Sequence, residues 1–388
     1  MPTQRYEFLI VSDETTTGFA YLCIYNRTTK DAMDERYCII MAGGIGSRFW
    51  PLSKDTCPKQ FIDILGTGRS FIRATFERLL PLVPADHFLV VTNASYRELV
   101  LQHLPELSPN QVLCEPMRRN TAPCIAYASW HIRSRCRDAQ IIVTPADHIV
   151  TNEWAFQQTL SSGLQFLSSP DHRHALLTIG IKPSRPETGY GYIEVPVSCN
   201  EVVLHVVRFK EKPNHQQAEA FLSAGNFLWN SGIFLWNLSG IEGALRRHLP
   251  ELSNIMDEGA SRFGTAEEQD FIDTAFPRCP NISIDYGVLE PATDRYVIPA
   301  DFGWSDVGTW GSLFTLTKHD DNDNTLIGRV LTQDCHHNVV NIEEGVEAIV
   351  QGLDNYLVAY RGGALLICRM HDEQHIKEWV EQLHSSTN

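Results

Sequence analysis

The sequence predicts an α/β fold in which a mainly parallel sheet is flanked by helices and followed by a small β-rich C-terminal domain. Three observations support this prediction. Between residues 37 and 150, short apolar runs typical of buried strands alternate with longer segments of helical spacing. Most of these runs end in a glycine-rich or polar loop, at the edge of a parallel sheet where ligands bind. After residue 319, short strand-like segments separated by turns replace the alternation.

The elements of the predicted sheet can be placed in order along the chain. Buried strands are expected at 38–42, 87–93, 111–115 and 140–150, and helices at 69–83, 96–107 and 120–135. The third helix has good N-cap chemistry at Asn120 or Thr121. Strands that alternate with helices in this way form βαβ units with right-handed crossovers, so their carboxyl ends share one edge of the sheet.

The composition is that of a globular protein. With 388 residues, 43% hydrophobic and 20% charged, the chain can bury a substantial core, and it has no apolar run long enough to span a bilayer. The formal net charge of −15 argues against nucleic-acid or membrane partners, because a polyanion would be repelled over most of the molecule. The ten cysteines form no CxxC pair, so we expect reduced thiols in a cytoplasmic protein.

The stretch 37–61, YCIIMAGGIGSRFWPLSKDTCPKQF, organises the chain. Its glycines can turn the backbone sharply and point several N–H groups at one object, and the cations that follow suit a polyphosphate. The same glycines could instead cap an ordinary strand. The stretch is not a Walker A loop or a dinucleotide fingerprint, because Gly-Lys-Ser/Thr and the third glycine are missing. The residues that could hold phosphate are Ala42, Gly43, Gly44, Gly46, Ser47, Arg48 and Lys59.

Taken whole, GGIGSRFWPLS…PKQF resembles the signature of the sugar-phosphate nucleotidyltransferases, most closely that of the mannose-1-phosphate guanylyltransferases. Phe49 stands where leucine is usual, and further matching strings run in the expected order to the carboxyl terminus. The resemblance implies a Rossmann-like nucleotide-diphospho-sugar transferase fold. It also implies that the glycine loop and Arg48 hold the nucleotide phosphates and that Lys59 contacts phosphate too.

A second matching string implies the base site. Residues 115–123, EPMRRNTAP, resemble the family's base-recognition segment, in which a turn reads one edge of a purine. Without the resemblance, this string could be a helix N-terminus with a solvated basic turn. The implied nucleotide contacts are Glu115, Pro116, Arg119, Asn120 and Thr121.

Two aspartates are implied as ligands of a catalytic Mg²⁺. Asp147 lies in TPADH at the end of a predicted strand, Asp306 lies in WSDVG, and each matches a metal aspartate of the family. Carboxylates suit this ion, because Mg²⁺ is a hard cation that prefers oxygen and bridges phosphates. Read alone, Asp147 could instead cap the turn after its strand.

Further strings imply the sugar-phosphate site. The glycine-tyrosine segment, residues 189–192, combines backbone amides that can approach a ligand closely with aromatic faces that suit a sugar ring, although plain hairpins show the same alternation. In the Glu-Lys-Pro element, residues 211–213, the resemblance implies that the glutamate binds sugar hydroxyls and the lysine binds the 1-phosphate. This element could otherwise be a solvated loop. The implied sugar-site residues are Gly189, Tyr190, Gly191, Tyr192, Glu211, Lys212, Asn230, Ser231 and Asp285.

Three segments are predicted: 1–36 as an extension of undetermined order, 37–318 as the catalytic domain, and 319–388 as a β-rich domain. The last segment is expected to end in an amphipathic helix through Ile376 and Val380. In the family, a tail of this kind packs on the catalytic domain and makes dimer contacts, so a homodimer is expected.

The predicted reaction joins GTP and α-D-mannose 1-phosphate to give GDP-mannose and pyrophosphate, by Mg²⁺-dependent in-line attack on the α-phosphorus. The sugar phosphate is already anionic near neutral pH, so no general base is required. Arg48, Lys59 and Lys212 are the candidate catalytic residues, because the protein must offset the repulsion between two anions. Two alternatives stay open: the same chemistry on another hexose 1-phosphate or NTP, and a non-catalytic regulatory paralogue.

Overall fold

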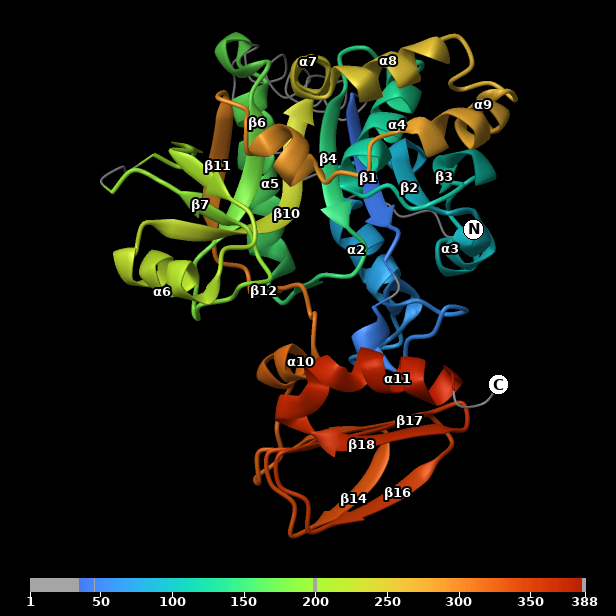
Figure 1. The fold of residues 1–388 in the computed structure, drawn as a ribbon, viewed down its shortest axis with the longest axis vertical. Helices are drawn as coiled ribbons and strands as arrows, with labels where there is room; N and C mark the ends of the chain where they lie inside the picture. Colours follow the sequence, from blue (N-terminus) through green and yellow to red (C-terminus); the bar gives the residue numbers. More distant parts are fainter. Residues whose placement is uncertain (1–34, 45, 198–200, 386–388) are drawn as a thin grey trace, which may run out of the picture.

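The computed structural model describes residues 35–44, 46–197 and 201–385. The extension predicted at 1–36 therefore lies almost wholly outside the described residues. A single mixed, mostly parallel sheet of ten strands forms the centre of the larger body, in the order β3-β2-β1-β4-β10-β6-β11-β8, with β7 beside β10 and β9 beside β7 (Figure 1). Its strands are β1 Arg36–Ala42, β2 Phe88–Asn93, β3 Val112–Glu115, β4 Gln140–Pro145, β6 Leu176–Ile181, β7 Tyr192–Glu194, β8 Leu204–His205, β9 Arg208–Lys210, β10 Phe227–Asn237 and β11 Arg295–Ala300.

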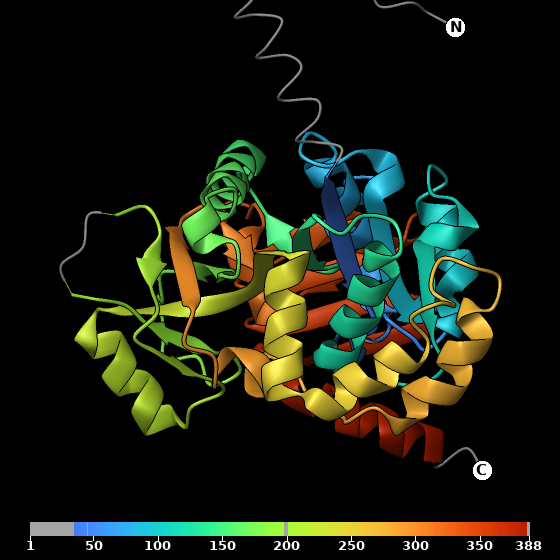
Figure 2. The same ribbon diagram turned by 90° about the horizontal axis from the view of Figure 1, so that it is seen from above.

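Helices cover both faces of this sheet, which confirms the predicted fold class (Figure 2). Side chains of α4, α7, α8 and α9 share one buried cluster with one face of the sheet, and those of α2, α3 and α5 share a second cluster with the other face. The helices are α2 Phe71–Leu79, α3 Arg97–His103, α4 Thr121–Arg133, α5 Glu153–Leu167, α6 His215–Ala224, α7 Leu238–His248, α8 Pro250–Glu258 and α9 Glu268–Ala275.

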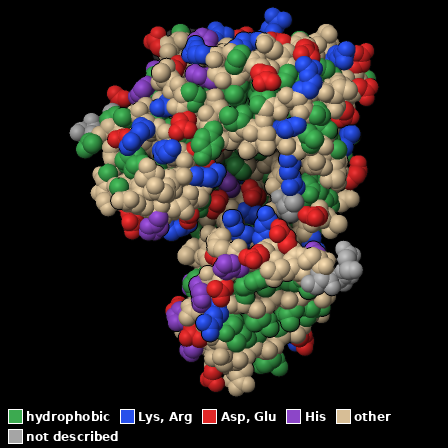
Figure 3. Space-filling view, viewed as in Figure 1, with side chains coloured by type: hydrophobic (Ala, Val, Ile, Leu, Met, Phe, Trp, Pro, Cys, Tyr) green, Lys and Arg blue, Asp and Glu red, His purple; other side chains and the backbone are tan. Residues whose placement is uncertain are grey.

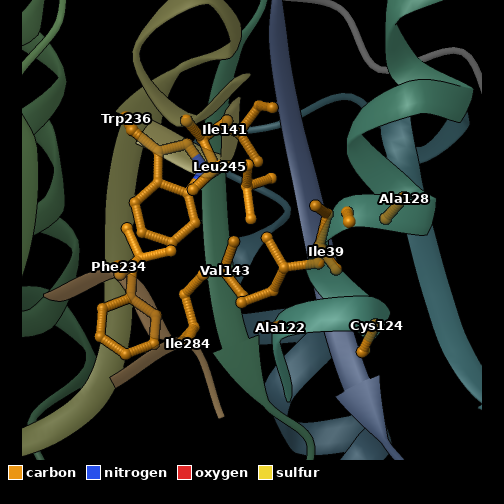
Figure 4. Close-up of a cluster of buried hydrophobic side chains, with 14 of the residues drawn as sticks. Ile39, Ala122, Cys124, Ala128, Ile141, Val143, Phe234, Trp236, Leu245 and Ile284 are labelled. Atoms are coloured by element: carbon orange, nitrogen blue, oxygen red, sulfur yellow. The ribbon is translucent and has the colours of Figure 1, made fainter. Parts of the chain in front are cut away.

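Strand β1 is apolar throughout its centre because both of its faces are covered. Ile39 belongs to the cluster under α4 together with Val143 of β4 and Trp236 of β10, whereas Cys38 and Ile40 belong to the cluster on the opposite face (Figure 4). All three β1 side chains are fully buried, and burying each isoleucine contributes about 1.5–3 kcal/mol. This packing fixes the height at which β1 ends and the glycine-rich loop begins.

Strand β10, FLWNSGIFLWN, carries a polar kink at its centre. It runs antiparallel to β4 and β6, and its register against β6 shifts between Asn230 and Phe234. Gly232 lies in this irregular stretch with φ of +72°. The kink turns the side chain of Asn230 toward a pocket while both arms of the strand stay buried.

The C-terminal region is β-rich, as predicted, and its strands stack as successive turns of the chain. β13, β15 and β17 pair in parallel, β14 pairs in parallel with β16, and β18 closes the stack antiparallel to β17. A hydrogen bond between two buried asparagines stabilises the stack. Asn338 Nδ2 donates to Asn324 Oδ1 at 2.8 Å, and both residues are 0% exposed. The strands are β13 Thr325–Ile327, β14 Arg329–Gln333, β15 Val339–Ile342, β16 Glu347–Gln351, β17 Tyr356–Arg361 and β18 Ala364–Arg369.

The C-terminal region packs on the larger body through a shared core. Helices α10 (Trp310–Leu316) and α11 (Ile376–Ser385) lie between the body and the C-terminal strands in Figure 1. Phe49, which lies just beyond the glycine loop, and Trp310 share one buried cluster with Leu357 and Ile376. Within the described residues no helix is long and apolar enough to cross a membrane, and the eight cysteines described there are all free.

Candidate active site

The glycine-rich loop is anchored where it leaves β1. The carbonyl of Ala42 accepts hydrogen bonds from Gln60 Nε2 and Thr92 Oγ1, each at 2.8 Å. Gly46 has φ of +70°, and a Cβ at this position would lie 2.4 Å from Cβ of Lys59. A glycine is therefore required here, because the loop passes directly over the Lys59 side chain.

Lys59 joins the two predicted metal aspartates. It is 3% exposed, and its Nζ donates to Asp147 Oδ2 at 2.9 Å and to the backbone carbonyl of Asp306 at 2.6 Å. Burial alone would raise the pKa of Asp147, but the Lys59 ammonium, which also hydrogen-bonds to it, outweighs burial and holds that pKa below its ordinary value. Asp147 is therefore an ionised carboxylate at neutral pH.

A short two-stranded sheet brings Asp306 to this point. β12 (Trp304–Ser305) pairs antiparallel with β5 (Ile149–Val150), directly after the strand end that carries Asp147. Asp306 Oδ1 then accepts hydrogen bonds from the Tyr190 hydroxyl at 2.6 Å and from the Gly308 N–H at 3.1 Å. The carboxylate of Asp147 and the backbone carbonyl of Asp306, which are far apart in sequence, thus meet at one lysine.

This donor set fits Mg²⁺. Each of Asp147 and Asp306 keeps one carboxylate oxygen that none of the contacts above uses. Among the described residues there is no group of three or more His, Cys, Asp or Glu arranged to hold a metal ion. Mg²⁺ is commonly bound in this manner, through one or two carboxylates completed by substrate phosphates and water.

A pocket of about 190 Å³ opens beside Asp306, which lines it together with His148, the residue after Asp147. Figure 3 shows Lys and Arg side chains gathered in the hollow between the larger body and the C-terminal strands. The pocket collects residues from the end of β4, from the segment before β7, from the kink in the middle of β10 and from a π-helical turn, Asp285–Leu289. The predicted sugar-site residues that line it are Gly189, Tyr190, Gly191, Glu211, Asn230, Ser231 and Asp285.

One wall of the pocket is acidic and holds unused acceptors. Asn230 Nδ2 donates to Asp285 Oδ1 at 2.8 Å, and burial, with Glu211 nearby, raises the pKa of Asp285 to about 7. Glu211 Oε1 pairs with Lys212 Nζ at 2.9 Å, whereas its Oε2 is buried without a hydrogen-bond partner among the described residues. A buried acceptor of this kind is suited to the hydroxyl groups of a ligand.

The predicted base site also contains a carboxyl oxygen, on Glu115, that has no hydrogen-bond partner among the described residues. Glu115, at the end of β3, is 7% exposed; its Oε1 has no partner in the described part of the chain, and burial raises its pKa to about 8. Its Oε2 lies 3.9 Å from the place where a Cβ would stand on Gly43. The glycine loop and the predicted base site are therefore adjacent.

The other side chains of this segment are engaged within the protein. Arg119 Nη2 donates to the carbonyl of Pro277, and Asn120 caps α4 by accepting from the Thr121 N–H at 3.0 Å. The Thr121 hydroxyl accepts from the backbone N–H of Ile284 at 2.9 Å. These contacts hold the predicted base site in place, whereas Glu115 Oε1 and Arg119 Nε have no hydrogen-bond partner among the described residues.

Comparison with known proteins adds to this geometry. The nucleotidyl transferase family model matches residues 37–323, which is most of the chain. The chain belongs to this family. It is an enzyme of nucleotidyl transfer.

The relatives of this nucleotidyl transferase carry consistent names. A protein of Xanthomonas campestris pv. campestris (strain B100), xanthan biosynthesis protein XanB, is 36% identical over 359 residues, which are 91% of this chain and 74% of that protein. Mannose-1-phosphate guanylyltransferase 2 of Escherichia coli O157:H7 is 34% identical, over 89% of this chain and 73% of its own. A solved structure from Thermus thermophilus, described as a mannose-1-phosphate geranyltransferase, is 29% identical with a TM-score of 0.80, over 90% of this chain and 99% of that one.

The structure of this nucleotidyl transferase does not bring every predicted site residue to the pocket. The ring of Tyr192 is 0% exposed and packs on Phe221, with ring centres 5.4 Å apart. Ser231 lines the pocket, but its hydroxyl donates to the carbonyl of Ile179 at 2.8 Å and so supports the kink of β10. Arg48 is exposed at the end of the loop.

Two residues that the sequence analysis passed over stand in the site. His148 and Trp304 both line the pocket, and Trp304 Nε1 donates to His148 Nδ1 at 3.2 Å. The available signal was position, because His148 directly follows Asp147 in TPADH.

Proposed function

We propose that this enzyme joins GTP and α-D-mannose 1-phosphate to give GDP-mannose and pyrophosphate. The observation that carries the proposal is the meeting of Lys59, Asp147 and Asp306 between the glycine loop and the pocket. Relatives named mannose-1-phosphate guanylyltransferase, which match 89% of the chain, support the choice of base and sugar.

The residues of the chain would act mainly by position and charge. The glycine-loop amides and Arg48 would hold the triphosphate, and Lys212 at the pocket rim would hold the sugar phosphate. The sugar-phosphate oxygen attacks the α-phosphorus in line, the bond from that phosphorus to the bridging oxygen breaks, and pyrophosphate leaves. Holding both anions in this geometry removes most of the entropic cost of their encounter.

Lys59 would contribute in a second way. Its ammonium group lies between Asp147 and the carbonyl of Asp306, so it fixes the spacing of the two loops that carry the carboxylates. Asp147 and Asp306 would hold Mg²⁺, which when bound supplies positive charge to the phosphate oxygens. Tyr190 would orient the Asp306 carboxylate through its 2.6 Å hydrogen bond.

Pyrophosphate release tests the proposal directly. The purified protein is incubated with Mg²⁺ and each pair drawn from mannose 1-phosphate or glucose 1-phosphate and GTP, ATP, UTP or CTP. We expect the fastest release with GTP and mannose 1-phosphate. Faster release with another pair would assign another substrate, and no release with any pair, despite binding of a sugar nucleotide, would favour the regulatory paralogue. The presence of Lys59, Asp147, Asp306 and Lys212 argues against the paralogue.

We also propose a cytoplasmic homodimer. The free thiols support a reducing compartment. Leu331 and Ile349 face each other in register across β14 and β16, and they are 53% and 77% exposed. Such a pair suits contact with a second copy, and the molecular mass in solution, measured by light scattering for the chain and for Ile349→Lys, tests this.

A further inference from the structure

The hydrogen bond between Trp304 and His148 fixes where the histidine carries its proton. An indole N–H can only donate, so the Nδ1 atom of His148, 3.2 Å from Trp304 Nε1, is the acceptor. The neutral imidazole therefore carries its proton on Nε2. The two rings meet edge to face with centres 5.3 Å apart, and Tyr190 packs edge to face on Trp304 from another side at 5.5 Å. The orientation of the His148 ring is set by packing as well as by the hydrogen bond.

The Nε2–H group has no partner among the described residues. No hydrogen bond joins it to any of them, and it is not among their buried unpaired atoms. His148 lines the 190 Å³ pocket. Its Cε1 atom, which is bonded to Nε2, lies 3.9 Å from the place where a Cβ would stand on Gly232, in the kink that follows Asn230. The donor thus lies on the side of the pocket where the predicted sugar residues gather.

We propose that His148 binds substrate, donating a hydrogen bond from Nε2 to an oxygen of the sugar 1-phosphate, and that Trp304 is a positioning residue that holds the required tautomer. The identity of this ligand rests on the proposed function. The two ring nitrogens of His148 thus have separate roles: Nδ1 accepts a hydrogen bond from the protein, and Nε2 donates one to the ligand.

Two substitutions divide these roles between the ring nitrogens. In His148→Asn, the side-chain amide reaches only as far as Nδ1, so it can accept from Trp304 but cannot reach the ligand. In His148→Gln, the amide nitrogen reaches the position of Nε2, so the donor to the ligand is kept and the contact with Trp304 is lost. A histidine with a purely structural role would tolerate asparagine better than glutamine, and a histidine that binds substrate predicts the opposite order.

The measurements are the dissociation constants of GDP-mannose and of GMP by calorimetry, with kcat and KM for both substrates. GMP is the control because the sugar 1-phosphate becomes the β-phosphate of GDP-mannose, which GMP lacks. For His148→Asn we expect GDP-mannose binding to weaken about ten- to a hundredfold, as for loss of a hydrogen bond to a charged group, with GMP binding unchanged. We expect a smaller loss for His148→Gln, and in both variants a larger rise in KM for mannose 1-phosphate than for GTP. An equal loss of GMP and GDP-mannose affinity, or a larger loss in the glutamine variant, would overturn the proposal.

Trp304→Phe tests the tautomer without touching the ring that binds. It keeps an aromatic ring in the same place and removes the N–H group, so we expect weaker GDP-mannose binding with normal GMP binding. Unchanged GDP-mannose affinity would remove Trp304 from the proposal. Failure of the proposed function is recognised separately, in the wild type: if it prefers another sugar nucleotide, the same variants are compared on that ligand and its nucleoside monophosphate.

Discussion

Replacing Gly46 by alanine tests whether the glycine loop exists to let Lys59 lie beneath it. At φ of +70°, alanine occupies the left-handed region at a cost of about 1–2 kcal/mol. Its Cβ would also lie 2.4 Å from Cβ of Lys59, whereas carbon atoms normally approach no closer than about 3.5 Å. Since Lys59 is 3% exposed, the lysine cannot relieve this contact by moving into solvent.

The second part of the cost comes from the bonds that Lys59 would lose. A shift of about 1 Å stretches both Nζ contacts, to Asp147 at 2.9 Å and to the Asp306 carbonyl at 2.6 Å. Breaking a buried ion pair costs about 3–5 kcal/mol, and we take less than the low end because the Asp147 side chain is 34% exposed. We therefore expect Gly46→Ala to lose about 3 kcal/mol of unfolding free energy and about a hundredfold or more in kcat/KM.

Gly68→Ala is the matched control. Gly68 has φ of +80°, but no heavy atom lies within 4 Å of the place where its Cβ would stand, so this variant measures backbone strain alone. We expect it to lose about 1 kcal/mol and to keep its activity. Urea unfolding and pyrophosphate release are measured for both variants. Equal losses of stability in the two, or full turnover in Gly46→Ala, would refute the argument that the glycine serves Lys59.

Four further predictions concern single side chains. Asp306→Asn should abolish Mg²⁺-dependent turnover while thermal unfolding stays cooperative, and normal turnover would remove it from the metal site. Lys212→Ala should raise KM for mannose 1-phosphate more than KM for GTP, because its ammonium is exposed beside Glu211 at the pocket; equal changes would count against that placement. Trp310→Phe removes the N–H that donates to the Arg48 carbonyl at 3.0 Å, so KM for GTP should rise several-fold and KM for the sugar phosphate should change less. Asp285→Asn should become more stable relative to the wild type as pH rises from about 4 to 7. Because the folded protein raises the pKa of Asp285 to about 7, the unfolded chain loses this proton first, and the wild type's unfolding free energy falls over that interval. Parallel pH profiles of unfolding free energy for the two proteins would contradict the assignment.

Much of the fold could be predicted because its signals are local. An apolar run such as β1 must be buried on both faces, and the glycines after it permit the sharp turn that ends the strand. Asn120 predicts the start of α4, because its side chain can accept a hydrogen bond from a free N–H in the first turn of a helix. In the structure it does so. Strings such as these determine where strands and helices begin, and alternation of the two then favours the parallel sheet.

The remaining features depend on partners that are distant in the chain. The indole N–H of Trp304 donates a hydrogen bond to His148, 156 residues away in the chain. The indole N–H of Trp310 donates to the carbonyl of Arg48, 262 residues away. A buried tryptophan signals that its N–H needs a partner without saying which one. The stacking of the C-terminal strands was hidden for a similar reason, since short strands between turns are compatible with hairpins as well as with parallel stacking.

The two ends of the candidate active site are supported differently. The sugar end is built on the central sheet, because Asn230 lies on β10 and its hydrogen-bond partner Asp285 lies in a turn packed against the same body. The phosphate end depends on the C-terminal domain: Phe49 shares a core with Leu357 of β17, and a carboxylate oxygen of Glu373 accepts from the N–H of Gly311 in the first turn of α10, the helix that begins with Trp310. A substitution that disrupts the packing of this domain should therefore displace the glycine loop more than the predicted sugar pocket. This asymmetry is the physical reason to expect Trp310→Phe to act on KM for GTP rather than on KM for the sugar phosphate.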